Sequence, residues 1–200
     1  MVRGTAQDDR VSPRRGIVFG PSLVGVAAAA TLLTAMMALP VLRAPTERIF
    51  GREIVGRHHD PFTVMRQFAG APVPPPYLQP ATDWVGRALA ALVPPVSAYN
   101  LVVLLTFPLA AIFGWLLAFA ITQSAVASTV AGLAFAFSPF HLAHAAYHPH
   151  IAQVQWVPLF LLALWRCLHG FTARRAATLV VSIALVTLSN FYAGLIAAAL

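Results

Sequence analysis

The feature that most constrains this chain is the stretch from Ala88 to Trp165, which contains no Asp, Glu, Lys or Arg. A helix needs about 20 apolar residues to cross the roughly 30 Å hydrocarbon core of a bilayer. The charge-free stretch is therefore long enough for three spans with short connections. A soluble domain of this length would turn charged faces toward water, and this stretch has none. The sequence predicts an integral membrane protein.

The composition of the whole chain agrees with this prediction. Hydrophobic residues make up 59% of the sequence and charged residues 10%, against roughly 25% charged residues in soluble domains. The net charge of +7 comes from 13 basic residues, all arginines, which lie between the hydrophobic segments and form no basic stripe. This distribution argues against nucleic acid as a partner and favours the lipid bilayer. The single cysteine, Cys167, cannot form an intramolecular disulfide.

Five hydrophobic segments predict an all-α, polytopic transmembrane bundle of about five spans. The first segment, 16–42, is too long for the core of a cleaved signal peptide and is expected to be an anchored span. The other spans are expected at about 99–122, 125–141, 154–168 and from 177 onward. The chain is still hydrophobic at Leu200, so the transmembrane domain, 16–200, is expected to be incomplete at its C-terminal end. Residues 1–15 are polar and are expected to form a disordered cytoplasmic N-terminus.

One long polar insertion, 43–96, separates the first two spans and holds four of the six acidic residues. Its Pro-rich part, 71–76, is expected to be extended, because proline fixes φ and removes a backbone donor. Two short interfacial helices are expected at about 60–68 and 83–92. Asp83 is a suitable acidic residue for the N-terminal turn of the second helix.

The arginines also predict an orientation. Four arginines precede the first span, and Arg166, Arg174 and Arg175 separate the fourth span from the fifth. The positive-inside rule puts both groups in the cytoplasm. The loop 43–96 and the His-rich turn 141–150 then face the outside of a multi-pass protein of the plasma membrane, although six arginines in the loop run against the rule.

The first candidate site is the run from Arg57 to Pro61, which includes His59 and Asp60. An aspartate beside histidines can accept a proton from an attacking hydroxyl, and Arg57 or Arg66 can hold a phosphate through the planar guanidinium. The alternative is structural, with Asp60 capping a short helix that begins at Pro61. Both interpretations can hold together, because caps and active sites often share a loop.

The second candidate site is the histidine cluster His141, His144, His148 and His150. The spacing puts the first three on one helix face, and Pro149 is expected to end that helix. Such a face could bind zinc, but no cysteine or acid lies nearby in the sequence. Interfacial histidines, or a lining that contacts a phosphate, are the other interpretations. No cofactor is certain, and the sequence leaves room for a divalent metal.

Polar residues in the later spans form two further candidates. Gln153 and Gln155 open the fourth span, and Asn190 with Tyr192 lies in the fifth. Polar groups at membrane depth usually face a protein cavity, because lipid offers them no partner. Interhelical hydrogen bonding is the structural alternative. No Gly-rich phosphate loop, Cys-X-X-Cys pair or Gly-X-Ser-X-Gly motif is present, so soluble nucleotide chemistry has no support.

Between about residues 56 and 192 these features together resemble a known family. After Asp60 the resemblance rests on the segments 94–101 (PPVSAYNL), 134–140 (AFAFSPF), His144, His148, 155–159 (QWVPL) and 191–192 (FY). In this order they resemble the N-terminal half of the GT-C superfamily, bacterial polytopic membrane glycosyltransferases that use polyprenyl-phosphate sugars.

The resemblance implies a glycosyltransferase of the cell envelope, or its N-terminal part, that transfers a sugar from a polyprenyl-phosphate donor at the outer membrane face. Asp60 matches the acid of the first outer loop and would be the catalytic base. The other residues would bind the substrates or offset the charge of the leaving phosphate, and they are Arg57, His59, Arg66, Asp83, His144, His148 and Gln155.

Two other classes of function stay open. A transporter or flippase for a lipid-linked or anionic substrate often contains inverted repeats and broken helices. Pro108 and Pro139 could break helices, but no repeat is visible in the sequence. A non-catalytic membrane subunit or a gene remnant is the third interpretation.

Overall fold

The computed structural model of the protein describes residues 19–51, 60–72 and 79–199. Helix accounts for 78% of the structure, and no strand occurs in the described residues. The prediction of an all-α transmembrane bundle is thereby confirmed. The polar tail 1–15 and most of the Pro-rich segment lie outside the described residues.

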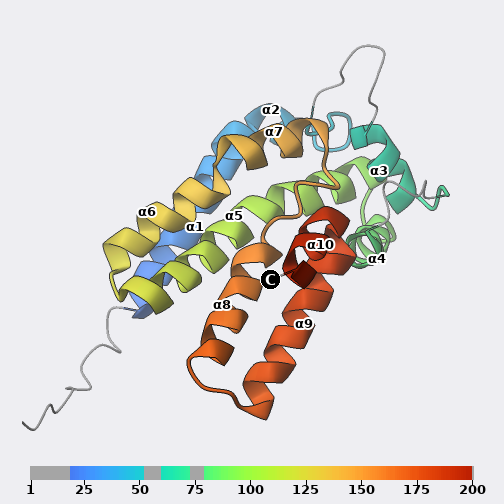
Figure 1. The fold of residues 1–200 in the computed structure, drawn as a ribbon. Helices are drawn as coiled ribbons and strands as arrows, with labels where there is room; N and C mark the ends of the chain where they lie inside the picture. The colour runs from blue at the N-terminus through green and yellow to red at the C-terminus, as the bar shows by residue number, and fades with distance from the viewer. Residues whose placement is uncertain (1–18, 52–59, 73–78, 200) are drawn as a thin grey trace, which may run out of the picture.

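The longest helix, α5 (Pro95–Thr122), runs through the middle of the bundle (Figure 1). It begins four residues before the predicted span, because Pro95 occupies a favourable first position of the helix. Pro108 lies inside α5 without ending it. The helix ends at Gln123, which has a positive φ of 53° and whose side-chain amide donates to the carbonyl of Phe119 at 2.9 Å.

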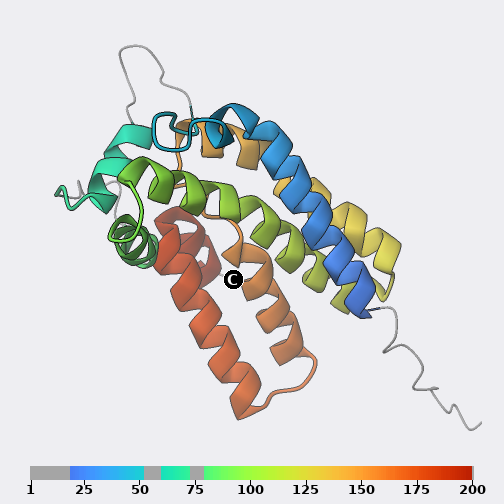
Figure 2. The same cartoon turned by 180° about the vertical axis from the view of Figure 1, so that it is seen from behind.

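α1 (Phe19–Met37) and α6 (Ala125–Ala136) pack beside each other along α5 (Figure 2). α2 (Leu39–Leu42) continues from α1, so these two helices make up the predicted first span. Gly114 of α5 faces Gly132 of α6, where a Cβ atom on Gly132 would lie 2.5 Å from the carbonyl oxygen of Ala111. Small residues of this kind let apolar helices approach to backbone contact, which is the usual basis of helix packing in membranes.

The predicted third span, 125–141, is interrupted. α6 ends at Ala136 and α7 (Pro139–Tyr147) begins after two residues, because a residue before proline disfavours the helical conformation. Ser138 caps α7, and its Oγ accepts a hydrogen bond from the backbone N–H of His141 at 3.3 Å.

The C-terminal helices differ from the sequence prediction in one respect. α8 (Trp156–Leu168) corresponds to the fourth span, but the expected fifth span is divided into α9 (Ala173–Ser189) and α10 (Phe191–Ala199), which packs back against α9. The division falls at Asn190, which has extended backbone angles and accepts a hydrogen bond from the N–H of Ala193 at 3.1 Å. Its amide donates to the carbonyl of Ile151 at 2.8 Å, so the same residue ties this turn to the segment after α7.

Two short amphipathic helices lie at one end of the bundle (Figure 1). They are α3 (Asp60–Phe68) and α4 (Pro80–Ala90), and they confirm the two short helices predicted in the polar insertion. α4 begins earlier than predicted, because Pro80 takes an N-terminal helical position. The two helices meet where the ring of Phe68 covers Gly86, a position at which any Cβ would overlap that ring.

The two ends of the bundle differ in chemistry. The aspartate end is formed by α2, α3, α4, α7 and their connections. Asn100 secures it, because its Oδ1 accepts from the N–H of Phe50 at 2.7 Å and its amide donates to the carbonyl of Arg48 at 2.8 Å. The arginine end is formed by the α5–α6 turn and the α8–α9 loop, with Arg166 in the last turn of α8 and Arg175 in the first turn of α9.

Candidate functional site

Asp60 opens α3 at the aspartate end and is almost completely buried, with 2% of its surface exposed. A carboxylate at a helix N-terminus interacts favourably with the helix dipole. Pro61 follows in the first turn, where its missing N–H costs nothing. A buried carboxylate also needs hydrogen-bonding or charged partners. The structure supplies such partners from a distant part of the sequence.

The partners are His148 and His150, in the turn that follows α7. Pro149 separates them, and α7 ends at Tyr147 as predicted. His148 Nδ1 lies 2.7 Å from Oδ2 of Asp60, and His150 Nδ1 lies 3.7 Å from the same oxygen. The backbone N–H of His148 also donates to the carbonyl of His144 at 2.7 Å, which holds the turn against the helix. Two imidazoles therefore converge on one carboxylate across 88 positions of sequence.

The two imidazoles have different environments. Burial lowers the pKa of His150 to about 4, the Asp60 carboxylate works against this shift, and His148 and His144 add to it. His150 is therefore uncharged at neutral pH. His148 is more open, since 29% of its side-chain surface is exposed against 3% for Asp60.

The contact with Asp60 assigns the tautomer of His148. An ionised carboxylate only accepts hydrogen bonds, so Nδ1 of His148 carries the hydrogen and donates it. In this tautomer of the neutral ring, the lone pair is on Nε2. The buried carboxylate orients this ring and stabilises the imidazolium that forms when Nε2 takes up a proton. The pair is thus equipped to accept a proton at the aspartate end.

The other two described histidines of the cluster have separate environments. The ring of His144 lies 4.2 Å from that of Phe140 and 5.6 Å from that of His148, measured between centroids, so His144 is a direct neighbour of His148. His141 is fully buried, and its Nε2 lies 2.9 Å from Oγ1 of Thr106 in α5. His141 therefore joins α7 to α5 within the core. Within the described residues, no group of three or more His, Cys, Asp or Glu could hold a metal ion.

The remaining predicted substrate-binding residues that the structure describes are Arg66, Gln155 and Asp83. Arg66 is exposed in the last turn of α3, six positions after Asp60 and so about 240° around the helix from it. Gln155 is buried before α8, where its amide donates to Oε1 of Gln153 at 3.0 Å and its own oxygen has no hydrogen-bond partner among the described residues. Arg57 and His59 lie outside the described residues.

Asp83 is a second buried carboxylate of the aspartate end. Burial raises its pKa to about 6, against the opposing effects of Arg87 and of the hydrogen bond from the backbone N–H of Gln79. Its Oδ1 has no hydrogen-bond partner in the part of the chain that the structure describes. The carboxyl group of Asp83 on α4 therefore titrates near pH 6.

Two polar residues of α5, Tyr99 and Asn100, support the site. In the sequence they were noted only as part of the segment 94–101 that resembles the GT-C superfamily. Tyr99 is fully buried in the same core cluster as Val64 of α3 and Ala152 of the segment after α7. Asn100 holds the loop that leads toward α3. The signal that could have identified both is the position of two polar side chains in succession in an otherwise apolar helix.

An apolar groove lies beside the histidine turn. It has a volume of about 240 Å³ and is bordered by Phe135, Phe140, Ile151 and Tyr192 among others. Ile151 directly follows His150, so the groove reaches the turn that contacts Asp60. A second apolar cavity of about 240 Å³ shares lining residues with the first and continues along α8, α9 and α10. The two cavities together form an apolar path from the histidine turn along the bundle.

These features define the class of the protein as a helical membrane protein with a polar cluster at one end of its bundle. The segments Pro95–Thr122 and Ala125–Tyr147 are each long and apolar enough to cross a membrane. The sequence model of one family, described as 6-pyruvoyl-tetrahydropterin synthase related domain, membrane protein, matches residues 77–200. The match covers more than half of the chain, so the chain belongs to this family. Comparisons with curated proteins and with solved structures find no match.

The resemblance to the GT-C superfamily was wrong. The family whose model matches is a different one, and no comparison indicates a GT-C glycosyltransferase. Membership supports the predicted association with the lipid bilayer, since the family is one of membrane proteins. The matched segment contains Asp83, His144, His148 and Gln155, and it begins after Asp60.

Proposed function

We propose that this chain is an integral membrane enzyme, or part of one, that transfers a group from a lipid-linked donor to a hydroxyl acceptor. His148 is the proton acceptor in this proposal, and Asp60 is the residue that positions it. The observation that carries the proposal is the 2.7 Å contact between the Asp60 carboxylate and the His148 imidazole. The roles differ from the sequence expectation, in which Asp60 itself takes the proton, because Asp60 is buried and His148 has the exposed ring.

The donor class that we propose is a sugar carried on polyprenyl phosphate. The acceptor oxygen attacks the anomeric carbon, the bond from that carbon to the phosphate oxygen breaks, and the phosphate leaves with the electron pair. Nε2 of His148 takes the hydroxyl proton, and the Asp60 carboxylate stabilises the imidazolium. The apolar path beginning at Ile151 supports a lipid-linked donor, because it offers a hydrocarbon chain access to the histidine turn.

We also propose an orientation for this multi-pass protein in the plasma membrane. The N-terminus and the arginine end face the cytoplasm, and the aspartate end faces outside. The support comes from Arg166, Arg174 and Arg175, which lie in the ends of α8 and α9 on either side of their short connection. In this orientation His148 would meet a donor lipid in the outer leaflet.

The test compares His148→Gln and Asp60→Asn in the full chain with a neighbouring control, Tyr147→Phe. Transfer from radiolabelled polyprenyl-phosphate sugars is measured in detergent micelles, where transport between compartments produces no signal. We expect His148→Gln to lower kcat at least about 100-fold, the lower range for general base catalysis. Asp60→Asn should also lower kcat, because the carboxylate that orients the His148 ring through the 2.7 Å contact is lost.

Two results would contradict the proposal. One is that the wild-type protein transfers the sugar and that His148→Gln and Asp60→Asn both transfer it as fast as the Tyr147→Phe control. The other is substrate movement into sealed vesicles by a protein that shows no transfer in micelles, which would identify a transporter.

A further inference from the structure

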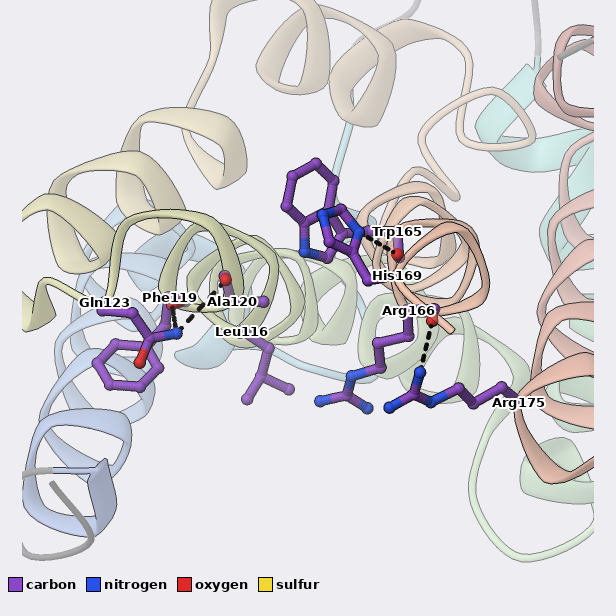
Figure 3. Close-up of a pocket in the computed structure, with 8 residues that line it drawn as sticks. All are labelled: Leu116, Phe119, Ala120, Gln123, Trp165, Arg166, His169 and Arg175. Atoms are coloured by element: carbon purple, nitrogen blue, oxygen red, sulfur yellow. Dashed lines mark hydrogen bonds between the residues drawn. The ribbon is translucent and has the colours of Figure 1, made fainter. Parts of the chain in front are cut away.

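A separate pocket lies at the arginine end, at the opposite end of the bundle from His148. It has a volume of about 300 Å³ and opens between the C-terminal turns of α5 and α8 (Figure 3). Its lining includes Leu116, Phe119, Gln123, Trp165, Arg166 and Arg175. A polar cavity of about 350 Å³ shares Arg166 and Arg175 with this pocket and is also lined by Arg174, Thr172 and Thr178.

Two guanidinium groups lie next to each other in this pocket (Figure 3). Nη1 of Arg175 donates to the carbonyl oxygens of Gly170 at 2.6 Å and Arg166 at 3.0 Å, so its side chain is held in place by the end of α8. The other side-chain N–H groups of Arg175 make no hydrogen bond with any described residue. The Arg166 guanidinium is exposed and makes no hydrogen bond or ion pair with any described residue.

No carboxylate of the described residues lies beside these charges. The sequence contains no Asp or Glu after Asp83, and the described acids Glu47, Asp60 and Asp83 all lie at the aspartate end. Two adjacent guanidinium groups repel each other unless an anion lies beside both. A phosphate suits this position, because it offers several acceptor oxygens to the planar donor fork of arginine.

The surroundings of the pocket are those of a membrane boundary. Ile121, Leu168 and Phe171 are exposed at this end by 53%, 74% and 79%. Exposed apolar side chains next to arginines are typical of the depth at which lipid headgroups meet the hydrocarbon core. Trp165, whose backbone carbonyl accepts from Nδ1 of His169 at 2.9 Å, adds an aromatic ring of the kind enriched at this depth.

We propose that this pocket binds a phosphate group through Arg166 and Arg175. The headgroup of an anionic phospholipid and a soluble phosphate both present this anion, and the experiment below separates the two sources. The site does not depend on the chemistry of Asp60 and His148, so either proposal can fail without the other.

Arg166→Gln is the test variant, because the Arg166 side chain supports no other described residue, whereas Arg175 also caps α8. Arg43→Gln is the matched control, since it removes the same charge from an exposed position at the other end of the bundle. The full chain is purified in uncharged detergent, and native mass spectrometry compares retention of phosphatidylglycerol with that of zwitterionic phosphatidylcholine. We expect the wild type to prefer phosphatidylglycerol, and Arg166→Gln to bind it about tenfold more weakly, equivalent to about 1.4 kcal/mol. Arg43→Gln should bind it as the wild type does.

The second arm uses inorganic phosphate. A soluble phosphate is assigned to the site if inorganic phosphate raises the Tm of the wild type but not that of Arg166→Gln. Chloride at the same ionic strength should not raise the Tm of either protein. The proposal is overturned if neither phosphatidylglycerol nor inorganic phosphate distinguishes the wild type from Arg166→Gln, or if Arg43→Gln weakens binding equally.

Discussion

Replacing Gly132 by alanine should force α5 and α6 apart. A Cβ at this position would lie 2.5 Å from the carbonyl oxygen of Ala111 and 3.0 Å from the backbone nitrogen of Trp115, where ordinary contacts begin at 3.4 Å. Both neighbours are backbone atoms of α5, so no side-chain rotation can relieve the overlap. The helices must therefore move apart locally by about 1 Å, and overpacking of this kind typically costs about 1–3 kcal/mol.

Gly25 of α1 provides the matched control, because a Cβ there would meet no atom within 4 Å. Alanine at Gly25 should be neutral or should stabilise the helix by up to about 1 kcal/mol through its higher helix propensity. The assay is thermal unfolding of the full chain in detergent, followed by circular dichroism. A Gly132→Ala protein that unfolds at or above the Tm of Gly25→Ala would refute the argument from helix contact.

Two further predictions concern polar groups of the aspartate end. The pKa of Asp83, about 6, lies above its ordinary value of 3.8, so the fold favours the protonated carboxyl and loses stability as the pH rises from about 4 to 6. Asp83→Asn should therefore unfold at a higher Tm than the wild type at pH 7, and the difference should vanish below pH 4; a constant difference across this range would contradict it. Asn100→Leu should lower the free energy of unfolding by about 1–3 kcal/mol, because it removes two hydrogen bonds, one from the partly buried N–H of Phe50 and one to the carbonyl of Arg48. An unchanged unfolding midpoint in denaturant would show that these hydrogen bonds do not secure the loop.

Local patterns in the sequence predicted most of the helices. The lack of charge from Ala88 to Trp165 predicted the core of the bundle, and Pro61 and Pro149 predicted where α3 begins and where α7 ends. The division of the last span at Asn190 was missed. Its cause is a hydrogen bond to Ile151, 39 positions away, which no local pattern reveals.

The candidate site was predicted in outline. Both Asp60 and His148 were identified from their residue types, and alternation of the spans placed them at the same end of the bundle. The family resemblance built on these residues was wrong, because short motifs in apolar sequences are shared by membrane proteins of different families. The phosphate pocket at the arginine end was also missed, since Arg166 and Arg175 were considered only as signals of orientation.

The sequence by itself determined that this chain is a helical membrane protein, because helix length, apolar content and proline positions act locally along the chain. Only the tertiary structure decided that Asp60 is the buried partner and His148 the exposed one. That difference arises from the packing of α3 against the turn after α7, which covers the carboxylate almost completely and the imidazole only in part. Burial and contact depend on residues 88 positions apart, and their effects on protonation appear only when the helices are packed together.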